Sequence, residues 1–326
     1  MSKDYSVVIR TLGNGGEKYK KLINSIAAQT IAPKEIIVVL PYDYELDYSL
    51  GNEKIIFSEK GMVVQRITGI NNAQTEFILV VDDDVAFDDD FVEKLFVCVE
   101  KTGADLISPT NGELEKWHFS FKNTVNKNIK ILKHILLGNR FIHFNPKYAV
   151  KIVGTGGHSI LNKIDKNQYY LTQSGNFQCF FMKTDCAKQL NYEEERWLED
   201  TGYAIFDDQV FFYKAFILNQ KVIFAPGIPY LHLDGGKGHI KRVESERLYR
   251  KLYGNTRNKT IFWKKFLYNR SCFVRKAWLI FCYLYSFINT LLVYILGNLF
   301  KPKSWSKTVK AVTKGMFDGL NYKLLK

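Results

Sequence analysis

Three consecutive carboxylates end an apolar segment in the first third of the chain. Residues 76–91 read EFILVVDDDVAFDDDF, and Asp82, Asp83 and Asp84 stand where the apolar run stops. Like charges at this spacing raise one another's pKa unless a cation compensates them. Mg²⁺ and Mn²⁺ accept such oxygen ligands and complete their coordination with water and phosphates. The three acids therefore predict a divalent-metal site for a substrate that carries a diphosphate.

A structural role is the alternative for these acids. Carboxylates after a strand often cap the helix that follows, and Asp88, Asp89 and Asp90 stand directly before the amphipathic segment FVEKLFVCVEK. We assign the capping role to this second group. A DxD motif alone is a weak signal, so the role of residues 82–84 has to be judged from the surrounding elements.

The segments around the acids alternate between strand and helix patterns. The expected order is strand 5–11, helix 17–30, strand 33–43, strand 54–59, helix 61–73 and strand 76–81. Residues 13–16, GNGG, have no GxGxxG or Walker pattern and are expected to form a turn. The alternation predicts an α/β fold, in which ligands bind beyond the carboxyl ends of the strands, where residues 82–84 fall.

Three stretches of the first 110 residues have a family-like order and spacing: SVVIRT, then LINSIAAQT followed by IIVV, then QRITGINNAQTEFILVVDDD. Together they resemble the nucleotide-sugar-binding half of a family 2 glycosyltransferase with the GT-A fold. The resemblance implies a mixed, Rossmann-like sheet flanked by helices and a nucleotide-diphosphate sugar as donor. The chain departs from the family pattern after the second strand, where LPYDYELD replaces an acidic pair and leaves Asp43 as a substitute for base recognition.

The second half of the chain contains further acids that the resemblance implies. FDDQVFFYKAFILNQK places Asp207 and Asp208 at the start of a helix, where the family has its catalytic base, and we assign the base to Asp208. An ordinary helix cap is the alternative, and Glu199 with Asp200 forms a rival acidic pair. In several relatives a His at the position of His232 is a metal ligand, and imidazole suits Mn²⁺ better than Mg²⁺.

The resemblance also implies how the site works. The metal, Mn²⁺ or Mg²⁺, is expected on Asp82, Asp84 and His232, where it neutralises the departing diphosphate. The donor is expected to contact Arg10, Thr11, Arg66 and Asp83, with a surface role as the alternative for either arginine. Asp208 is expected to take the proton of an acceptor hydroxyl in a single displacement that inverts the anomeric configuration. Trp197 is expected either to stack on a sugar or to pack in the core.

Composition divides the chain unevenly. The formal net charge is +13, but residues 241–326 contain 19 Lys and Arg against 3 acids, so residues 1–240 have a net charge of −3. With 326 residues and a hydrophobic share of 46%, the chain has room for one large domain and an appendage. We divide it into a catalytic domain, 1–240, with a nucleotide-sugar half, 1–110, and an acceptor half, 111–240, and a basic helical tail, 241–326.

The tail contains an uncharged segment, residues 277–300. As a helix it is about 36 Å long, enough to cross a hydrocarbon core of about 30 Å. Basic residues on both flanks define no orientation, and a polar stripe runs along the segment: Ser286, Asn289, Thr290 and Gly297. We expect association with an anionic membrane surface, as a peripheral, re-entrant or single-span segment. A buried helix or a dimer contact is the alternative, and the uncharged segment argues against nucleic acid as the partner.

Residues 1–8, MSKDYSVV, lack the pattern of a signal peptide, and the five cysteines have no CxxC spacing. Both observations fit a reducing cytoplasm and exclude a zinc site of the usual spacing. We expect the protein at the cytoplasmic face of the cell membrane. Residues 111–172 have no clear pattern, and their position in the family implies that they select the acceptor.

These observations together predict a metal-dependent inverting glycosyltransferase. Its expected acceptor is a hydroxyl of a glycan or of a lipid-linked sugar in surface polysaccharide biosynthesis, because YGNTRN, residues 253–258, resembles a tail segment of family members that build such polymers. The alternatives are a nucleotidyltransferase, which would need a richer loop than GNGGEK, and a membrane-bound scaffold or binding protein that keeps the fold without turnover. A dehalogenase-type phosphatase is disfavoured because Val85 and Ala86 follow the acids.

Overall fold

Aliphatic and β-branched side chains build the first strands in the computed structural model, which describes residues 3–111, 132, 134–202, 204–233, 244–298 and 302–324. Four strands pair in parallel in the order β3-β2-β1-β4: β1 (Tyr5–Arg10), β2 (Glu35–Pro41), β3 (Glu53–Ser58) and β4 (Phe77–Asp82). α1 (Glu17–Ala27) connects β1 to β2, and α2 (Met62–Asn72) connects β3 to β4. The carboxyl ends of β1 and β4 therefore lie next to each other.

The sheet continues beyond β4 with strands of mixed direction. β11 (Cys179–Lys183) is antiparallel to β4 and to β6 (Leu106–Thr110), and β12 (Val222–Pro229) is parallel to β6. The remaining strands follow in the order β10 (Tyr170–Thr172), β8 (Tyr148–Ile152), β9 (His158–Leu161) and β7 (Arg140–His143). The described residues thus form one mixed sheet of 11 strands.

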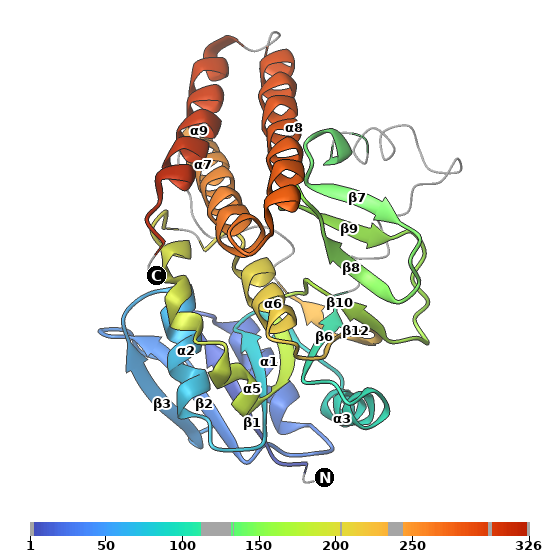
Figure 1. Ribbon diagram of the computed structural model, residues 1–326. Helices are drawn as coiled ribbons and strands as arrows, with labels where there is room; N and C mark the ends of the chain where they lie inside the picture. The colour runs from blue at the N-terminus through green and yellow to red at the C-terminus, as the bar shows by residue number, and fades with distance from the viewer. Residues whose placement is uncertain are drawn as a thin grey trace.

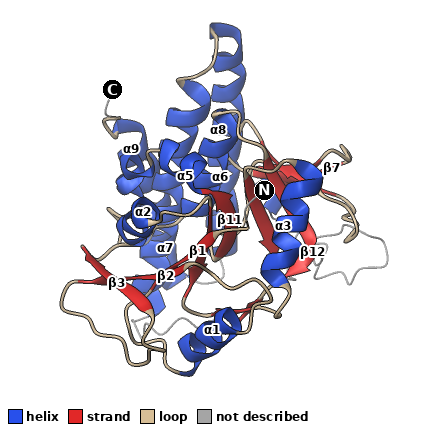
Figure 2. Cartoon of the chain, turned by 90° about the horizontal axis from the view of Figure 1, so that it is seen from below, coloured by secondary structure: helices blue, strands red, loops and turns tan. Residues whose placement is uncertain are grey.

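Helices cover both faces of the sheet because alternate strand residues point to opposite faces. Val7, Ile9 and Leu79 pack with residues of α1 and of α3 (Phe91–Thr102). Val8 and Val80 pack on the other face, with α2, α5 (Thr184–Gln189) and α6 (Asp207–Ile217). Figure 2 shows α1 on the side of the sheet opposite to α2, α5 and α6. The predicted alternation of strands and helices thus becomes a layered α/β structure.

A second, two-stranded sheet lies beside the acids. β5 (Val85–Ala86) follows the three carboxylates directly, and it pairs antiparallel with β13 (Leu231–His232). In this register His232 is opposite Val85, and the backbone N–H of Leu233 donates to the carbonyl oxygen of Asp84 at 2.7 Å. The small sheet therefore brings together Asp84 and His232, which are 148 positions apart in the sequence.

Three helices and a π-helical turn make up the C-terminal part, which rises from one end of the sheet layers (Figure 1). They are α7 (Glu244–Phe262), η3 (Trp263–Tyr268), α8 (Phe273–Asn298) and α9 (Pro302–Asn321). Phe262, Trp263 and Phe266 join the same hydrophobic core as Val210 and Phe211 of α6. The basic tail is therefore packed against the helices that cover the sheet, through α7 and η3.

The predicted fold class is confirmed, with a large mixed sheet, flanking helices and one apolar C-terminal helix. Within the described part of the chain, Phe273–Leu296 is the helix that is long and apolar enough to cross a membrane, and 17% of its most apolar window is buried. The domain boundary near residue 240 stays a prediction. The later part of the segment 111–172 contains β7 to β10, while residues 112–131 and 133 lie outside the described residues.

A buried carboxylate joins these layers. Glu195 of the 3₁₀ helix η2 (Tyr192–Leu198) is 0% exposed. It accepts hydrogen bonds from Lys214 of α6 at 2.8 Å, from Lys265 of η3 at 2.9 Å and from the Trp197 indole at 2.6 Å. One charge thus connects three elements, and its loss would leave two ammonium groups without their shared partner.

We expect Glu195→Gln to lower the free energy of unfolding by about 3 to 5 kcal/mol, because breaking a buried ion pair leaves an uncompensated charge. Glu194→Gln is the matched control, since Glu194 also contacts Lys214, at 3.0 Å, but its side chain is 61% exposed. The control should cost less than about 1 kcal/mol. Urea unfolding followed by circular dichroism measures both, and equal losses would contradict the connecting role of Glu195.

Candidate active site

The ends of β1 and β4 bring Arg10 and Asp82 together. The two residues are register partners at the carboxyl ends of adjacent parallel strands. Arg10 Nη2 lies 3.0 Å and Arg10 Nε 3.3 Å from Asp82 Oδ1. The strand pairing therefore fixes this ion pair in the folded chain, before any ligand binds.

Arg66 of α2 connects the first acids to the second acidic pair. Its side chain is 1% exposed; Nη2 lies 2.8 Å from Asp82 Oδ1, and Nη1 lies 2.9 Å from Asp207 Oδ2. The guanidinium carbon is 4.0 Å from the centroid of the Phe177 ring, which covers it. Burial alone would raise the pKa of Asp82, but Arg10 and Arg66 outweigh it and hold the pKa below its ordinary value. Asp82 is therefore an ionised carboxylate between two arginines.

Asp83 is held on the other side of the strand end. Thr11 Oγ1 donates to Asp83 Oδ2 at 2.6 Å and accepts from the backbone N–H of Gly13 at 3.0 Å. Gly13 has a φ of +80°, and a Cβ there would lie 1.9 Å from the carbonyl oxygen of Glu45. The GNGG segment is thus the expected turn, and a glycine is required where it approaches the next loop.

His232 and Asp84 face each other across the two-stranded sheet. His232 Nε2 lies 3.1 Å from Asp84 Oδ2 and 3.1 Å from Gln178 Nε2. The Tyr230 hydroxyl donates to Gln178 Oε1 at 3.1 Å, which turns the amide N–H of Gln178 toward the imidazole. In this orientation the His232 Nε2 lone pair is an acceptor, so two acceptors, an imidazole nitrogen and a carboxylate oxygen, lie side by side.

Two acceptors at this distance fit a divalent cation. Adjacent ligands of an octahedral ion at about 2.1 Å are about 3.0 Å apart, close to the separation of His232 Nε2 and Asp84 Oδ2. Asp82 is held by its arginines, and no group of three or more His, Cys, Asp or Glu side chains with metal-binding geometry occurs among the described residues. The described residues thus offer two candidate ligands, and Mg²⁺ or Mn²⁺ commonly completes such a shell with water and substrate phosphates.

The start of α6 places Asp207 and Asp208 in different surroundings. Phe206, just before the helix, has a φ of 80°, a conformation that is costly for a non-glycine residue and is often found at functional sites. Asp207 binds Arg66, whereas Asp208 accepts the backbone N–H of Gln209 at 2.7 Å. Burial raises the pKa of Asp208 to about 7, and the charge of Asp207 acts in the same direction. Asp208 is therefore the carboxylate with a proton affinity suited to a general base near neutral pH.

Residues 6–113 match the model of the family described as glycosyl transferase family 2. These residues form a glycosyl transferase family 2 domain. No curated protein sequence matches it. Similar solved structures include Staphylococcus aureus TarS 1-349 (13% identity, 95% of this chain and 90% of that chain covered, TM-score 0.45) and the mannosyltransferase PcManGT from Pyrobaculum calidifontis in complex with GDP-Man and Mn²⁺ (11% identity, 97% and 87% covered, TM-score 0.47).

Glu199 and Asp200, the alternative acidic pair, have structural roles in this glycosyltransferase. Glu199 Oε1 accepts the backbone N–H of Val63 at 2.6 Å at the start of α2, and Asp200 pairs with Arg257 of α7. Trp197 is 4% exposed and packs in the core, which was one of the two roles expected for it. Arg66 is buried, so its surface alternative is wrong, while its contact with a donor phosphate stays a prediction.

Two residues near the site had no role in the sequence-based expectation. Gln178 reaches His232 because it directly precedes β11, which is antiparallel to β4 and so begins where β4 ends. A polar residue directly before a buried strand is a signal that could have identified Gln178. Arg140 of β7 acts electrostatically on Asp208 and lowers its pKa, against the effect of burial. It comes from the segment whose pattern predicted no element, so no signal was present.

We expect Asp208→Asn to stabilise the glycosyltransferase at pH 8 by about 1 to 3 kcal/mol. The pKa of Asp208 is about 7 when folded against an ordinary 3.8, so its favourable contribution is complete below pH 4 and is lost as the pH rises through 7. The gain in the Asn variant should therefore vanish at pH 4. Urea unfolding of both proteins at the two pH values measures it, and an equal gain at both would contradict the raised pKa.

Proposed function

We propose that this glycosyltransferase is metal-dependent and inverting, and that it transfers a sugar from a nucleoside diphosphate to a hydroxyl of a glycan or lipid-linked acceptor. The observation that carries the proposal is the single guanidinium of Arg66, which binds Asp82 at the end of β4 and Asp207 at the start of α6. This link fixes the distance between the acids at the end of β4, on the proposed donor side, and the acids at the start of α6, on the proposed acceptor side. A single displacement requires such a fixed distance.

Each group then has a chemical task. Asp84 and His232 would hold Mn²⁺ or Mg²⁺, which supplies charge neutralisation for the diphosphate leaving group. Arg10 and Asp83 lie at the same strand ends and border the position of the donor. Asp208, with a pKa raised to about 7, takes the proton of the acceptor hydroxyl as the oxygen attacks the anomeric carbon. With one attack on the face opposite the leaving group, the anomeric configuration inverts.

Two other functions remain as outcomes of the test. A scaffold that keeps the fold without turnover has no need for the raised pKa of Asp208 or for the facing acceptors of Asp84 and His232. A nucleotidyltransferase would use the metal but not a base at α6. Donor cleavage that depends on both parts of the site distinguishes the proposal from these alternatives.

The test is release of nucleoside diphosphate from a panel of nucleotide sugars with Mn²⁺. We expect release from one donor, lowered about a hundredfold or more by Asp84→Asn and about 10² to 10⁴-fold by Asp208→Asn. Asp88→Asn is the control, because Asp88 is an exposed acid just beyond the site. Release unaffected by Asp208→Asn would argue against the base, and no release with any donor would favour the scaffold.

We further propose that α8 attaches the enzyme to the cytoplasmic face of the membrane, where it extends a surface glycan. One side of α8 leaves large apolar side chains exposed, with Trp278 and Phe281 each 60% exposed and Ile288 52% exposed. Such a surface suits the interface of a bilayer, and the net positive charge of residues 241–326 suits anionic lipid.

Flotation with phosphatidylglycerol vesicles measures this attachment. The double variant Trp278→Asp, Phe281→Asp should bind the vesicles at least about tenfold more weakly than the wild type, because it removes buried apolar area and adds negative charge. Tyr42→Asp is the control, since Tyr42 is also 60% exposed but lies after β2. Equal binding by all three proteins would place the contact elsewhere.

A further inference from the structure

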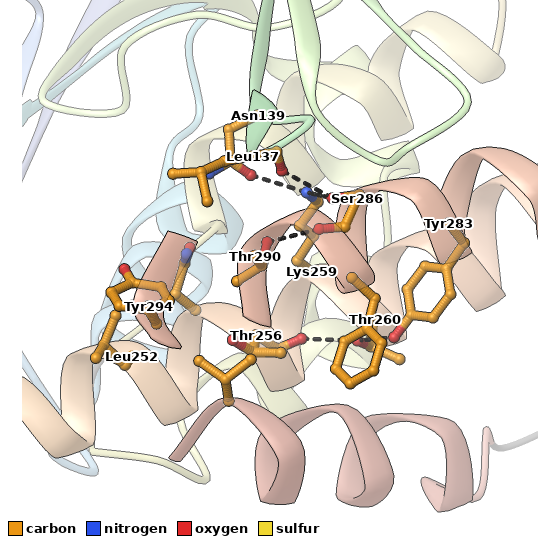
Figure 3. A pocket seen from close by; sticks show the side chains of 13 residues that line it. Leu137, Asn139, Leu252, Thr256, Lys259, Thr260, Tyr283, Ser286, Thr290 and Tyr294 are labelled. Carbon is orange, nitrogen blue, oxygen red and sulfur yellow. Dashed lines mark hydrogen bonds between the residues drawn. The ribbon is translucent and has the colours of Figure 1, made fainter. Parts of the chain in front are cut away.

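The C-terminal helices hold the loop that leads into β7. Lys259 of α7 is 8% exposed, and its Nζ donates to Asn139 Oδ1 at 2.8 Å and to the Gly138 carbonyl at 3.3 Å. Its third bond, at 2.8 Å, goes to Ser286 Oγ of α8, which in turn donates to the Leu137 carbonyl at 2.9 Å. In Figure 3 the side chains of Lys259 and Ser286 lie together next to this loop. The buried lysine therefore joins two helices to the loop.

This loop and a second one are seated closely on the helices. Gly138 has a φ of +62°, and a Cβ there would lie 2.8 Å from the Cβ of Ser286, so glycine allows an approach that other residues do not. The second loop, between β8 and β9, joins the first because Thr155 Oγ1 donates to the Gly138 carbonyl at 2.6 Å. Trp263 Nε1 of η3 donates to the Gly154 carbonyl of the same loop at 3.0 Å. The C-terminal helices thus hold both loops.

The two loops lead into strands that face the start of α6. Arg140 of β7 and His158 of β9 are register partners in parallel strands, so their side chains lie on the same face of the sheet. The Gln209 side chain and the charge of Arg140 both act on the His158 imidazole. Gln209 also connects this region to the base, since its Nε2 donates to the Gly156 carbonyl at 2.8 Å and its backbone N–H donates to Asp208 Oδ1 at 2.7 Å. We call the two loops and the starts of the two strands the base-side wall: residues 137–140 and 153–158.

The base-side wall contributes a positive charge to the surroundings of Asp208. Burial and the charge of Asp207 raise the pKa of Asp208 to about 7, whereas Arg140 and Arg66 act to lower it, and the Tyr192 phenol also faces this carboxyl. Arg66 is fixed by its own two ion pairs. Arg140 instead is placed by a strand whose leading loop the C-terminal helices hold. Because a charge interaction depends on distance, the position of β7 affects the base.

We propose that Lys259 is a positioning residue for sugar transfer: through the base-side wall it holds the guanidinium of Arg140 at a set distance from Asp208. Ser286 shares this task, since it carries the contact from α8 to the Leu137 carbonyl. The proposal rests on Asp208 as the base of the function proposed above. It gives the C-terminal helices a part in the reaction in addition to attachment.

The test compares the rates of nucleoside diphosphate release at pH 8.5 and pH 6, as a ratio. Without Arg140 the base keeps its proton to a higher pH, so Arg140→Met should lower release about tenfold at pH 6 and less than about twofold at pH 8.5. Lys259→Met should raise the ratio of the two rates about threefold, because a displaced Arg140 acts more weakly. A fraction of misfolded enzyme does not change this ratio. Lys251→Met, at an exposed position of α7, should keep the wild-type ratio.

Two further variants distinguish position from charge. Burial lowers the pKa of Lys259 to about 7, so this lysine itself titrates in the range of the test. Ser286→Ala changes no charge and should nevertheless raise the ratio in the same direction as Lys259→Met. In the Arg140→Met background, Lys259→Met should leave the ratio unchanged. An additive effect in this double variant, or an unchanged ratio in Lys259→Met alone, would overturn the positioning role.

A stability measurement separates this proposal from the proposed function. If no donor is cleaved, the function fails, but the titration of Asp208 can still be measured by urea unfolding. A higher pKa of the folded carboxyl costs more stability above that pKa, so Asp208→Asn should stabilise the Lys259→Met protein at pH 8 by more than it stabilises the wild type. An equal gain in the two backgrounds would overturn the positioning role, whatever the result with donors.

Discussion

The geometry of this enzyme depends on one buried guanidinium. Arg66 binds Asp82 and Asp207, and these acids belong to elements that pack on the core from different parts of the chain. A buried arginine is tolerable only with such partners, because an unpaired charge in the interior is costly. Movement of either acid would remove one of the two ion pairs of this buried charge, so the ion network holds the end of β4 and the start of α6 together.

Sequence patterns predicted the parts that local periodicity determines. The β-branched runs and helical spacing of the first 82 residues became β1 to β4 with α1 and α2, and the acids of residues 82–84 lie at the strand end as expected. Local sequence patterns did not predict which partner each of these acids contacts. Whether Asp82 meets a metal or an arginine depends on the register of β1 with β4 and on the rotamer of a residue in α2, and no spacing rule contains either.

The C-terminal part illustrates the same limit. The net charge and the apolar segment of this part can be recognised in the sequence, but its contacts with the rest of the structure cannot. Asn258 donates to the carbonyl oxygens of Leu198 and Ile205, and Arg257 donates to that of Trp197. These bonds satisfy the backbone of the loop that leads into α6. The YGNTRN segment thus supports the helix that carries Asp207 and Asp208, and it links α7 to that helix.

The two acids of α6 differ in a way that supports separate roles. Asp207 is tied to Arg66, and its carbonyl oxygen accepts the Tyr192 hydroxyl at 2.9 Å. Asp208 has a backbone N–H as its partner and a pKa raised to about 7. Neighbouring carboxylates with different surroundings are a recurring arrangement in which one orients and the other exchanges a proton. Because Arg66 holds Asp207 in place, the charge of Asp207 stays beside Asp208 and adds to the effect of burial on the pKa of Asp208.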